Sequence, residues 1–397
     1  MSEFDDIRPY HDDEVDGVLA SLLANQDFLE FIARFKLPRL SATLPGFAVY
    51  LVRLVLARQV RKVHSINDFQ KMVSSYARKL VLETMDGFRY MGLEHLDPGE
   101  SYLYVGNHRD IAGDSMLVDY ALYLAGRDTV RIAVGDNLVQ RQFATDLMKL
   151  NKSFLIRRSE TGAKKVYAAL LASSRYIHAS IASRNSIWIA QSEGRAKDGI
   201  DLTDPALVKM LTLAERKQAI GTTVKNLRIV PVSIAYEYDP CDLLKARELH
   251  SLKSQGGYNK APGEDLQSLV KGLGEFKGKV TLRFGAPLGD QFEIAEQVAS
   301  EIDRQILDGL QLYHINYWAL EQLSKRGPSE AEIAAGDGNH YNVVWQQVAH
   351  LADLDSLSVL ADRFDNCPEE HRLEWLQMYA NPIVNKVNHG SANLTPE

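Results

Sequence analysis

The apolar positions along the chain change their spacing twice. Residues 13–35 and 67–84 carry apolar side chains at helical intervals, which predicts a helical N-terminal region. From about residue 88 to residue 285, short apolar runs alternate with helix-like stretches. The runs that we predict as strands are 101–105, 129–134, 153–156, 186–190, 227–235 and 280–284. Residues 294–323 resume a helical pattern, and a polar tail begins near Asn388.

This alternation predicts an α/β layer structure whose ligand site lies in the loops beyond the strand ends. We divide the chain into a helical N-terminal region (1–84), an α/β domain (85–290) and a helical C-terminal region with its tail (291–397). The stretch 251–278 is rich in Gly, Lys and Ser, which indicates a long surface loop or a flap. Pro231 near the start of the strand 227–235 suggests an edge position or the first residue of pairing, although the segment taken alone favours a buried core strand.

Composition narrows the class of protein further. The formal net charge of −7 provides no general attraction to nucleic acid, so none is expected as a partner. The two cysteines, Cys241 and Cys367, are far apart and lack metal-ligand spacing, so we expect buried, inert thiols and no metal site. The acidic start of the chain lacks the order of a secretory signal, which favours the cytoplasm.

Residues 44–63 come nearest to a membrane segment. An apolar run there is interrupted by Arg53 and then by Arg58, Arg61 and Lys62, so it is too short and too charged to cross a bilayer. Four basic and no acidic residues suit a helix that lies on an anionic membrane surface. Leu51 and Leu54 fall on the same side as the basic residues, so a helix packed on the protein core explains the pattern equally well.

The strongest chemical signal is His108. It belongs to the triplet Asn107-His108-Arg109, which follows the apolar run 102–105. An imidazole accepts protons near neutral pH, and a carboxylate on its other nitrogen fixes the tautomer. Asp110 and Asp114 are both candidates for that carboxylate, and an ordinary polar turn is the alternative reading.

Three later segments carry further polar groups behind apolar runs. The strand 153–156 ends in Arg157 and Arg158, whose forked guanidinium groups match phosphate oxygens. Because successive strand residues face opposite sides, we favour Arg158. The strand 186–190 leads into Glu193-Gly194-Arg195 with Lys197, where glycine permits close approach of a ligand to the backbone. Each of these segments, taken alone, also fits a solvated strand end or a turn closed by a surface ion pair.

In this order, the segments resemble the four sequence blocks of the glycerolipid acyltransferase family, and the resemblance covers about half of the chain. Asn107-His108-Arg109 with Asp114 is similar to the first block, and Phe154 to Arg158 to the second. Glu193-Gly194-Arg195 is similar to the third block, and Val230 to Glu237 to the fourth. This chain differs in two places: five residues separate His108 from Asp114 where four are usual, and the third block is one residue shorter.

The resemblance implies a central mixed sheet flanked by helices, with helical extensions at both ends. It also implies acyl transfer from a thioester of coenzyme A or acyl carrier protein to a hydroxyl of glycerol 3-phosphate or its 1-acyl form, in phospholipid biosynthesis. The thioester is a co-substrate, and no cofactor or covalent acyl-enzyme is needed.

The resemblance assigns a role to each candidate residue. His108 is the general base and Asp114 its partner, while Arg157, Arg158, Arg195 and Lys197 bind the acceptor's phosphate. Glu193 and Gly194 are expected at the acceptor hydroxyl and the oxyanion. A lipid product implies peripheral contact with the inner face of the cytoplasmic membrane. Two alternatives stand beside this prediction: a hydrolase with a metal on His108, Asp110 and Asp114, and a lipid-binding protein without catalysis.

Overall fold

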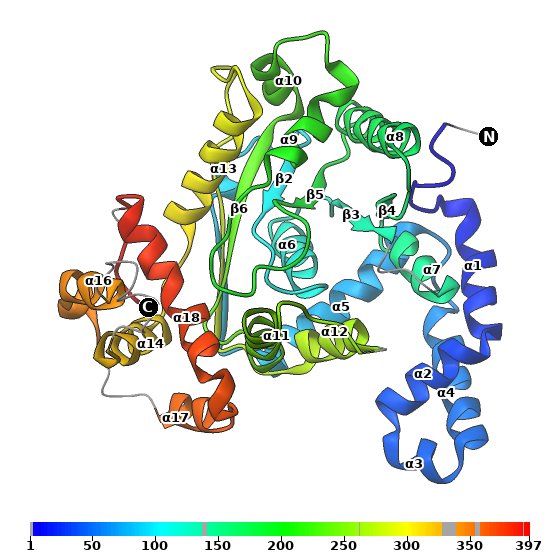
Figure 1. Ribbon diagram of the computed structural model, residues 1–397. Coiled ribbons are helices and arrows are strands. Elements are labelled where there is room, and N and C mark those ends of the chain that lie inside the picture. Colours follow the sequence, from blue (N-terminus) through cyan, green and yellow to red (C-terminus); the bar gives the residue numbers. More distant parts are fainter. Residues whose placement is uncertain (1–2, 137–140, 262, 328–338, 354–357, 392) are drawn as a thin grey trace. The chain divides into compact units, whose positions relative to one another are not determined.

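The computed structural model (Figure 1) describes residues 3–136, 141–261, 263–327, 339–353, 358–391 and 393–397. The chain forms two compact units, of which the smaller contains residues 1–77 and 128–187 and the larger residues 78–127 and 188–397. The strands of the larger unit form a mixed sheet flanked by helices, which confirms the predicted fold class.

The smaller unit is mostly helical. Its elements are α1 (Asp12–Ala24), α2 (Gln26–Lys36), α3 (Pro38–Thr43), α4 (Pro45–Val60), the first part of α5 (Ile66–Thr84), β3 (Arg131–Gly135), α7 (Gln142–Leu150), β4 (Ser153–Ile156) and α8 (Ala163–Ala182). Strands β3 and β4 pair in parallel. The predicted single helix over 13–35 is wrong, because Asn25 interrupts it: its side chain accepts a hydrogen bond from Phe28 N at 2.9 Å and caps α2.

The sheet of the larger unit holds five strands in the order β1-β7-β6-β2-β5. These strands are β1 (Gly87–Met91), β2 (Leu103–Gly106), β5 (Ile187–Ala190), whose first residue lies at the boundary, β6 (Ile229–Tyr236) and β7 (Lys279–Phe284). β1 pairs with β7 and β2 with β6 in parallel, while β6 and β7 are antiparallel.

The predicted edge position of Pro231 is wrong, because β6 lies between β2 and β7. Pro231 is paired with Val105 in the parallel register, and antiparallel pairing with β7 starts one residue later, at Val232. The carbonyl of Pro231 still accepts a hydrogen bond from Gly285 N at 2.8 Å. The proline therefore costs little at this place, although the strand is central.

Helices make up most of the rest of the larger unit. They are α6 (Gly113–Leu124), α9 (Pro205–Thr212), α10 (Ile220–Leu227), α11 (Asp242–Gln255), α12 (Glu264–Gly274), α13 (Ala295–Gly309), α14 (His314–Lys325), α16 (His340–Val348), α17 (Ser358–Asp365) and α18 (Arg372–Asn388). Short 3₁₀ turns occupy Leu93–His95, Leu213–Glu215, Ala349–Leu351 and Glu369–His371.

The predicted flap over 251–278 is also wrong, since α11 extends to Gln255 and α12 covers Glu264–Gly274. Leu266, Leu269 and Leu273 stand at helical intervals in α12, and its first turn is acidic, which suits a helix N-terminus. The glycine and lysine content of this stretch hides that spacing.

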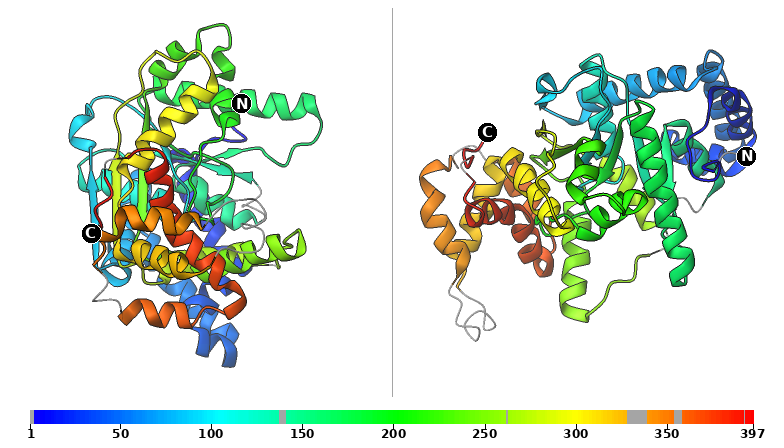
Figure 2. Two further views of the ribbon diagram at one scale, coloured as in Figure 1. Left: turned by 60° about the vertical axis from the view of Figure 1, so that its left-hand side comes forward. Right: turned by 90° about the horizontal axis from the view of Figure 1, so that it is seen from above.

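Each unit contains a hydrophobic core among its described residues. In the smaller unit, buried side chains of α1, α2 and α4 pack with Phe143 and Leu150 of α7. In the larger unit, α14, α16 and α18 lie side by side in each view (Figure 2) and enclose the fully buried Trp375. This second core also contains Ala235 and Tyr238, so the C-terminal helices pack directly behind the end of β6.

Candidate active site

His108 and Asp114 meet at the end of β2. His108 lies two residues beyond this strand, and its Nδ1 is 2.8 Å from Asp114 Oδ2. The same carboxylate oxygen accepts hydrogen bonds from Arg109 N at 2.7 Å and Asp110 N at 3.0 Å, and Oδ1 accepts one from Tyr236 Oη at 2.8 Å. The Asp114 side chain is fully buried, whereas that of His108 is 14 % exposed. A carboxylate held this way keeps the proton on Nδ1 and leaves Nε2 as the basic nitrogen.

The turn between the two residues accommodates the fifth intervening residue. Asp110 Oδ1 accepts hydrogen bonds from Ala112 N at 3.0 Å and Gly113 N at 2.5 Å, so its carboxylate faces the start of α6. The backbone thereby brings Asp114, on the first turn of α6, back to the imidazole. Burial raises the pKa of Asp110 above its ordinary value, with the Asp114 carboxylate adding to the effect. Asp110 is therefore a turn-forming residue in this geometry.

Asn107 fixes the end of β2 to β6. Its Oδ1 accepts a hydrogen bond from Ile234 N at 2.7 Å, and its Nδ2 donates to Ile234 O at 3.0 Å. The side chain thus continues the strand pairing beyond Gly106 and sets the direction in which the next residue, His108, leaves the sheet.

The Glu193-Gly194-Arg195 segment lies beside the histidine. Ala196 N donates to His108 O at 2.8 Å. Glu193 and Gly194 are exposed, and Gly194 has φ +78°, in the left-handed region that favours glycine. Arg195 is half-buried, and its Nη1 is a buried atom with no hydrogen-bond partner among the described residues. Lys197 is paired with Glu248 at 2.8 Å.

Arg157 and Arg158 belong to the smaller unit, and both are exposed. Arg157 Nη2 lies 2.8 Å from Asp6 Oδ2, and Arg158 N donates to Asp136 Oδ1 at 3.0 Å. Among the predicted site residues of the larger unit, the geometry thus brings together His108, Asp114 and the segment around Arg195.

A buried charged layer lies beneath the site, and the sequence patterns did not reveal it. Arg109 pairs with Asp201 through its guanidinium. Lys245 Nζ donates to Arg109 O at 2.8 Å and to Asp239 Oδ2 at 2.5 Å. Burial alone raises the pKa of Asp239, but Lys245, the Cys241 N–H and Arg109 together outweigh it and leave this pKa below its ordinary value. The layer fixes the Arg109 backbone, whose N–H binds Asp114.

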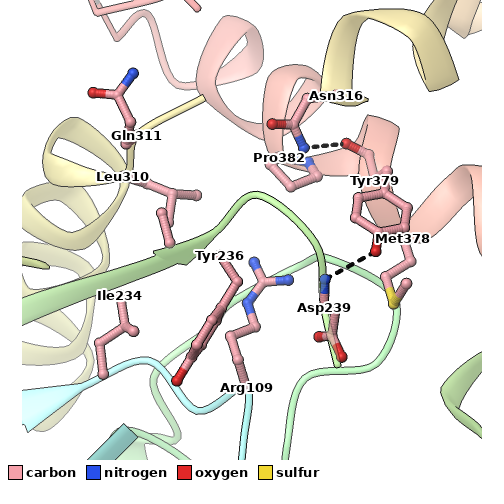
Figure 3. Close-up of a pocket in the computed structure, with 11 residues that line it drawn as sticks. Arg109, Ile234, Tyr236, Asp239, Leu310, Gln311, Asn316, Met378, Tyr379 and Pro382 are labelled. Atoms are coloured by element: carbon pink, nitrogen blue, oxygen red, sulfur yellow. Dashed lines mark hydrogen bonds between the residues drawn. The ribbon is translucent and has the colours of Figure 1, made fainter. Parts of the chain in front are cut away.

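A small cavity of about 30 Å³ is lined in part by Arg109 and Asp239 of this layer (Figure 3). It lies between the end of β6 and the C-terminal helices, and its lining residues include Arg109, Tyr236, Asp239, Asn316 and Tyr379. Tyr379 Oη accepts a hydrogen bond from Asp239 N at 2.9 Å (Figure 3). A cavity of this size admits water but not a lipid.

In the described part of the chain, we find neither a reactive thiol nor a cluster of metal ligands that would support a different reaction. Cys241 and Cys367 are buried free thiols, and burial raises their pKa values to about 12 and about 11, so both stay protonated and unreactive. No group of three or more His, Cys, Asp or Glu side chains within the described ranges is arranged to hold a metal ion. The metal-dependent hydrolase alternative therefore gains no support from the geometry at His108.

Comparison with known proteins agrees with these features. Residues 87–235 match the family model described as Acyltransferase, and this segment contains the His108 pair, both arginine-bearing segments and β6 as far as Ala235. Residues 87–235 are thus similar to an acyltransferase domain, in agreement with the resemblance of the sequence blocks. Among solved structures, the 1-acyl-sn-glycerophosphate (LPA) acyltransferase PlsC from Thermotoga maritima is similar at 14% identity and a TM-score of 0.38, covering 76% of this chain and 98% of that one. No curated protein matches the sequence.

Proposed function

We propose that this acyltransferase moves a fatty acyl group from a thioester of coenzyme A or acyl carrier protein to a hydroxyl of glycerol 3-phosphate or 1-acylglycerol 3-phosphate, in phospholipid biosynthesis. The observation that carries the proposal is the 2.8 Å contact between His108 Nδ1 and the buried Asp114 carboxylate, inside the segment that matches the family. Glu193 and Gly194 are exposed in the segment whose Ala196 N donates to His108 O.

In the proposed reaction, His108 Nε2 takes the proton of the acceptor hydroxyl while that oxygen attacks the thioester carbonyl carbon. The Asp114 carboxylate stabilises the imidazolium that forms. When the tetrahedral intermediate collapses, the carbon–sulfur bond breaks and the imidazolium returns the proton to the leaving thiolate. The Gly194 amide is proposed to donate to the oxyanion, and Glu193 to bind an acceptor hydroxyl. No covalent acyl-enzyme forms.

Arg195 is the proposed main contact for the acceptor's phosphate. A buried Nη1 atom without a partner in the described residues leaves a donor available for an anionic oxygen. Lys197 adds positive charge nearby, although Glu248 offsets part of it. The phosphate-binding roles of Arg157 and Arg158 stay predictions from the sequence blocks.

We expect the purified protein to consume acyl thioester only with a phosphate-bearing acceptor, and Arg195→Ala to raise the KM for that acceptor by about tenfold or more. A hydrogen bond between charged groups contributes roughly 1.5–3 kcal/mol, which sets this factor. The assay tests acyl-CoA and acyl carrier protein donors against glycerol 3-phosphate, its 1-acyl form and unphosphorylated glycerol. Arg304→Ala removes an exposed guanidinium that contacts only neighbours on its own helix, and serves as the control.

Two results of that assay would contradict the proposal. Equal transfer to glycerol and glycerol 3-phosphate would remove the phosphate role of Arg195. A folded protein that binds phosphate-bearing lipid but leaves every thioester intact would be the lipid-binding homologue.

We also propose that α4 lies on the cytoplasmic membrane surface. Four of its side chains, Phe47, Tyr50, Leu54 and Val55, are each at least half exposed. The opposite side of the helix packs into the core of the smaller unit through Ala48, Val49 and Val52. Arg53, Arg58 and Arg61 are exposed on the same helix and its C-terminal end, where they suit anionic headgroups. Among the described residues, no helix is long and apolar enough to cross a bilayer.

Phe47→Ser combined with Leu54→Ser is expected to weaken binding to anionic vesicles by at least about tenfold, because each apolar side chain contributes roughly 1.5–3 kcal/mol when it leaves water. Flotation with vesicles of phosphatidylglycerol and phosphatidylethanolamine measures this. Leu124→Ser with Val343→Ser changes two exposed apolar residues elsewhere and is the matched control. Equal loss in both double variants would show that α4 is not the membrane contact.

A further inference from the structure

Tyr236 is the last residue of β6, and its side chain reaches the first turn of α6 from a different strand than the one that delivers His108. Its hydroxyl donates a hydrogen bond to Asp114 Oδ1 at 2.8 Å, while His108 Nδ1 uses Oδ2. The two oxygens of one buried carboxylate therefore connect the phenol to the imidazole. Figure 3 shows the ring of Tyr236 beside Arg109.

We propose that Tyr236 is a positioning residue that tunes the basicity of His108 through Asp114. The kinetic part of this inference rests on the proposed function, since it assigns His108 the role of base. The structural part does not, because the hydrogen-bonded chain of three side chains is independent of any substrate.

The phenol is a permanent donor in this chain. Burial, and after it the Asp114 carboxylate, raises the pKa of Tyr236 well above its ordinary value, so the hydroxyl keeps its proton at all working pH values. A donated hydrogen bond stabilises the negative charge on Asp114. It thereby weakens the attraction between the carboxylate and the His108 imidazolium. Without the hydroxyl, Asp114 holds the imidazolium more strongly, and the pKa of His108 rises.

Asp114 itself should stay in place when the hydroxyl is removed. Its other oxygen still accepts from the Arg109 and Asp110 backbone N–H groups, at 2.7 Å and 3.0 Å. Tyr236→Phe retains the ring that packs at the end of β6 and deletes only the donor. The variant therefore separates tuning of the imidazole from collapse of the site.

The test is the titration of His108 in the full chain by NMR of ¹⁵N-histidine-labelled protein, with the signal assigned by its absence in His108→Gln. Tyr236→Phe is expected to raise the pKa of His108 by about 0.5–1 unit, which is ordinary for the loss of one hydrogen bond in a coupled pair. In the Asp114→Asn background, the same change is expected to leave the His108 titration unaltered. Tyr313→Phe, which removes another buried phenol hydroxyl, bonded to Thr281 Oγ1 at 3.0 Å, is the matched control and should not move it either.

The second readout is the pH dependence of kcat in the acyl-transfer assay. The acidic limb of the Tyr236→Phe profile is expected to move to higher pH by the same amount as the NMR titration, because His108 must be neutral to act. An unchanged titration in Tyr236→Phe would overturn the inference. A titration that moves while no acceptor is acylated by the wild-type chain would uphold the tuning role and refute the proposed function instead.

Discussion

His108→Ala is expected to lower kcat by about 10²–10⁴-fold, the usual loss when a general base is removed. The reason is local: Nδ1 is committed to Asp114, so Nε2 is the nitrogen of this ring available for the acceptor's proton. The His108 side chain is only 14 % exposed. The side-chain hydrogen bond that the substitution removes is the one to Asp114, so we expect the fold to be retained. Initial rates of thioester consumption with the best acceptor measure the effect.

His95→Ala is the matched control for this experiment. Its ring is 81% exposed and contacts the neighbouring Glu94, so the change removes an imidazole from the same domain without touching the site. We expect wild-type kcat from this variant. Near wild-type activity in a well-folded His108→Ala protein would remove the proposed mechanism at its core.

The position of His108 could be predicted because the apolar strand β2 and the Asn107-His108-Arg109 triplet are neighbours in the sequence. The choice between Asp110 and Asp114 could not, since it depends on a backbone turn. Both carboxylates are within reach by count, and the turn settles their directions: Asp110 binds the amides of Ala112 and Gly113, and Asp114 binds the imidazole.

The charged layer beneath the site was missed for a related reason. Asp201, Asp239 and Lys245 follow no motif, and each meets Arg109 only through the folded chain. Tyr236 lies inside the fourth sequence block, so the sequence assigned it to the region of the site. Its contact with Asp114 could not be predicted, because the two residues are 122 positions apart. Sequence spacing carries no information about such contacts.

The fold shows the same division between local and distant information. The strands β2 to β7 were predicted from runs of apolar residues, which are local, whereas β1 (Gly87–Met91) was missed. The interruption at Asn25 depends on a side-chain cap, which the period of the pattern does not show. The central place of Pro231 depends on which strands pair with β6, so the edge position that the proline suggested was wrong, while the buried strand itself was foreseen. The sequence of α12 does have apolar residues at helical intervals, but its glycines and lysines led to the prediction of a loop.

Asp201→Ala is expected to destabilise the larger unit by roughly 3–5 kcal/mol, because it leaves the buried Arg109 guanidinium without its ion-pair partner. Both side chains are almost completely shielded from water, at 11% and 1% exposure. Burial acts to lower the pKa of Arg109, but the carboxylates of Asp201 and Asp239 outweigh it and raise this pKa, so the arginine stays charged. The Asn107 amide also loses its 3.4 Å contact with Asp201 Oδ2. Urea denaturation followed by tryptophan fluorescence measures the loss.

Two further variants identify the cause of that loss. Glu296→Ala breaks the exposed ion pair with Lys209, 2.8 Å long, and is expected to change stability little, since water already solvates both partners. Arg109→Met combined with Asp201→Leu removes both buried charges and is expected to recover most of the stability that Asp201→Ala loses. If the double variant were as unstable as Asp201→Ala, the defect would come from lost packing or from Asn107. Recovery of stability without recovery of activity would show that this pair also serves to place the Arg109 backbone against Asp114.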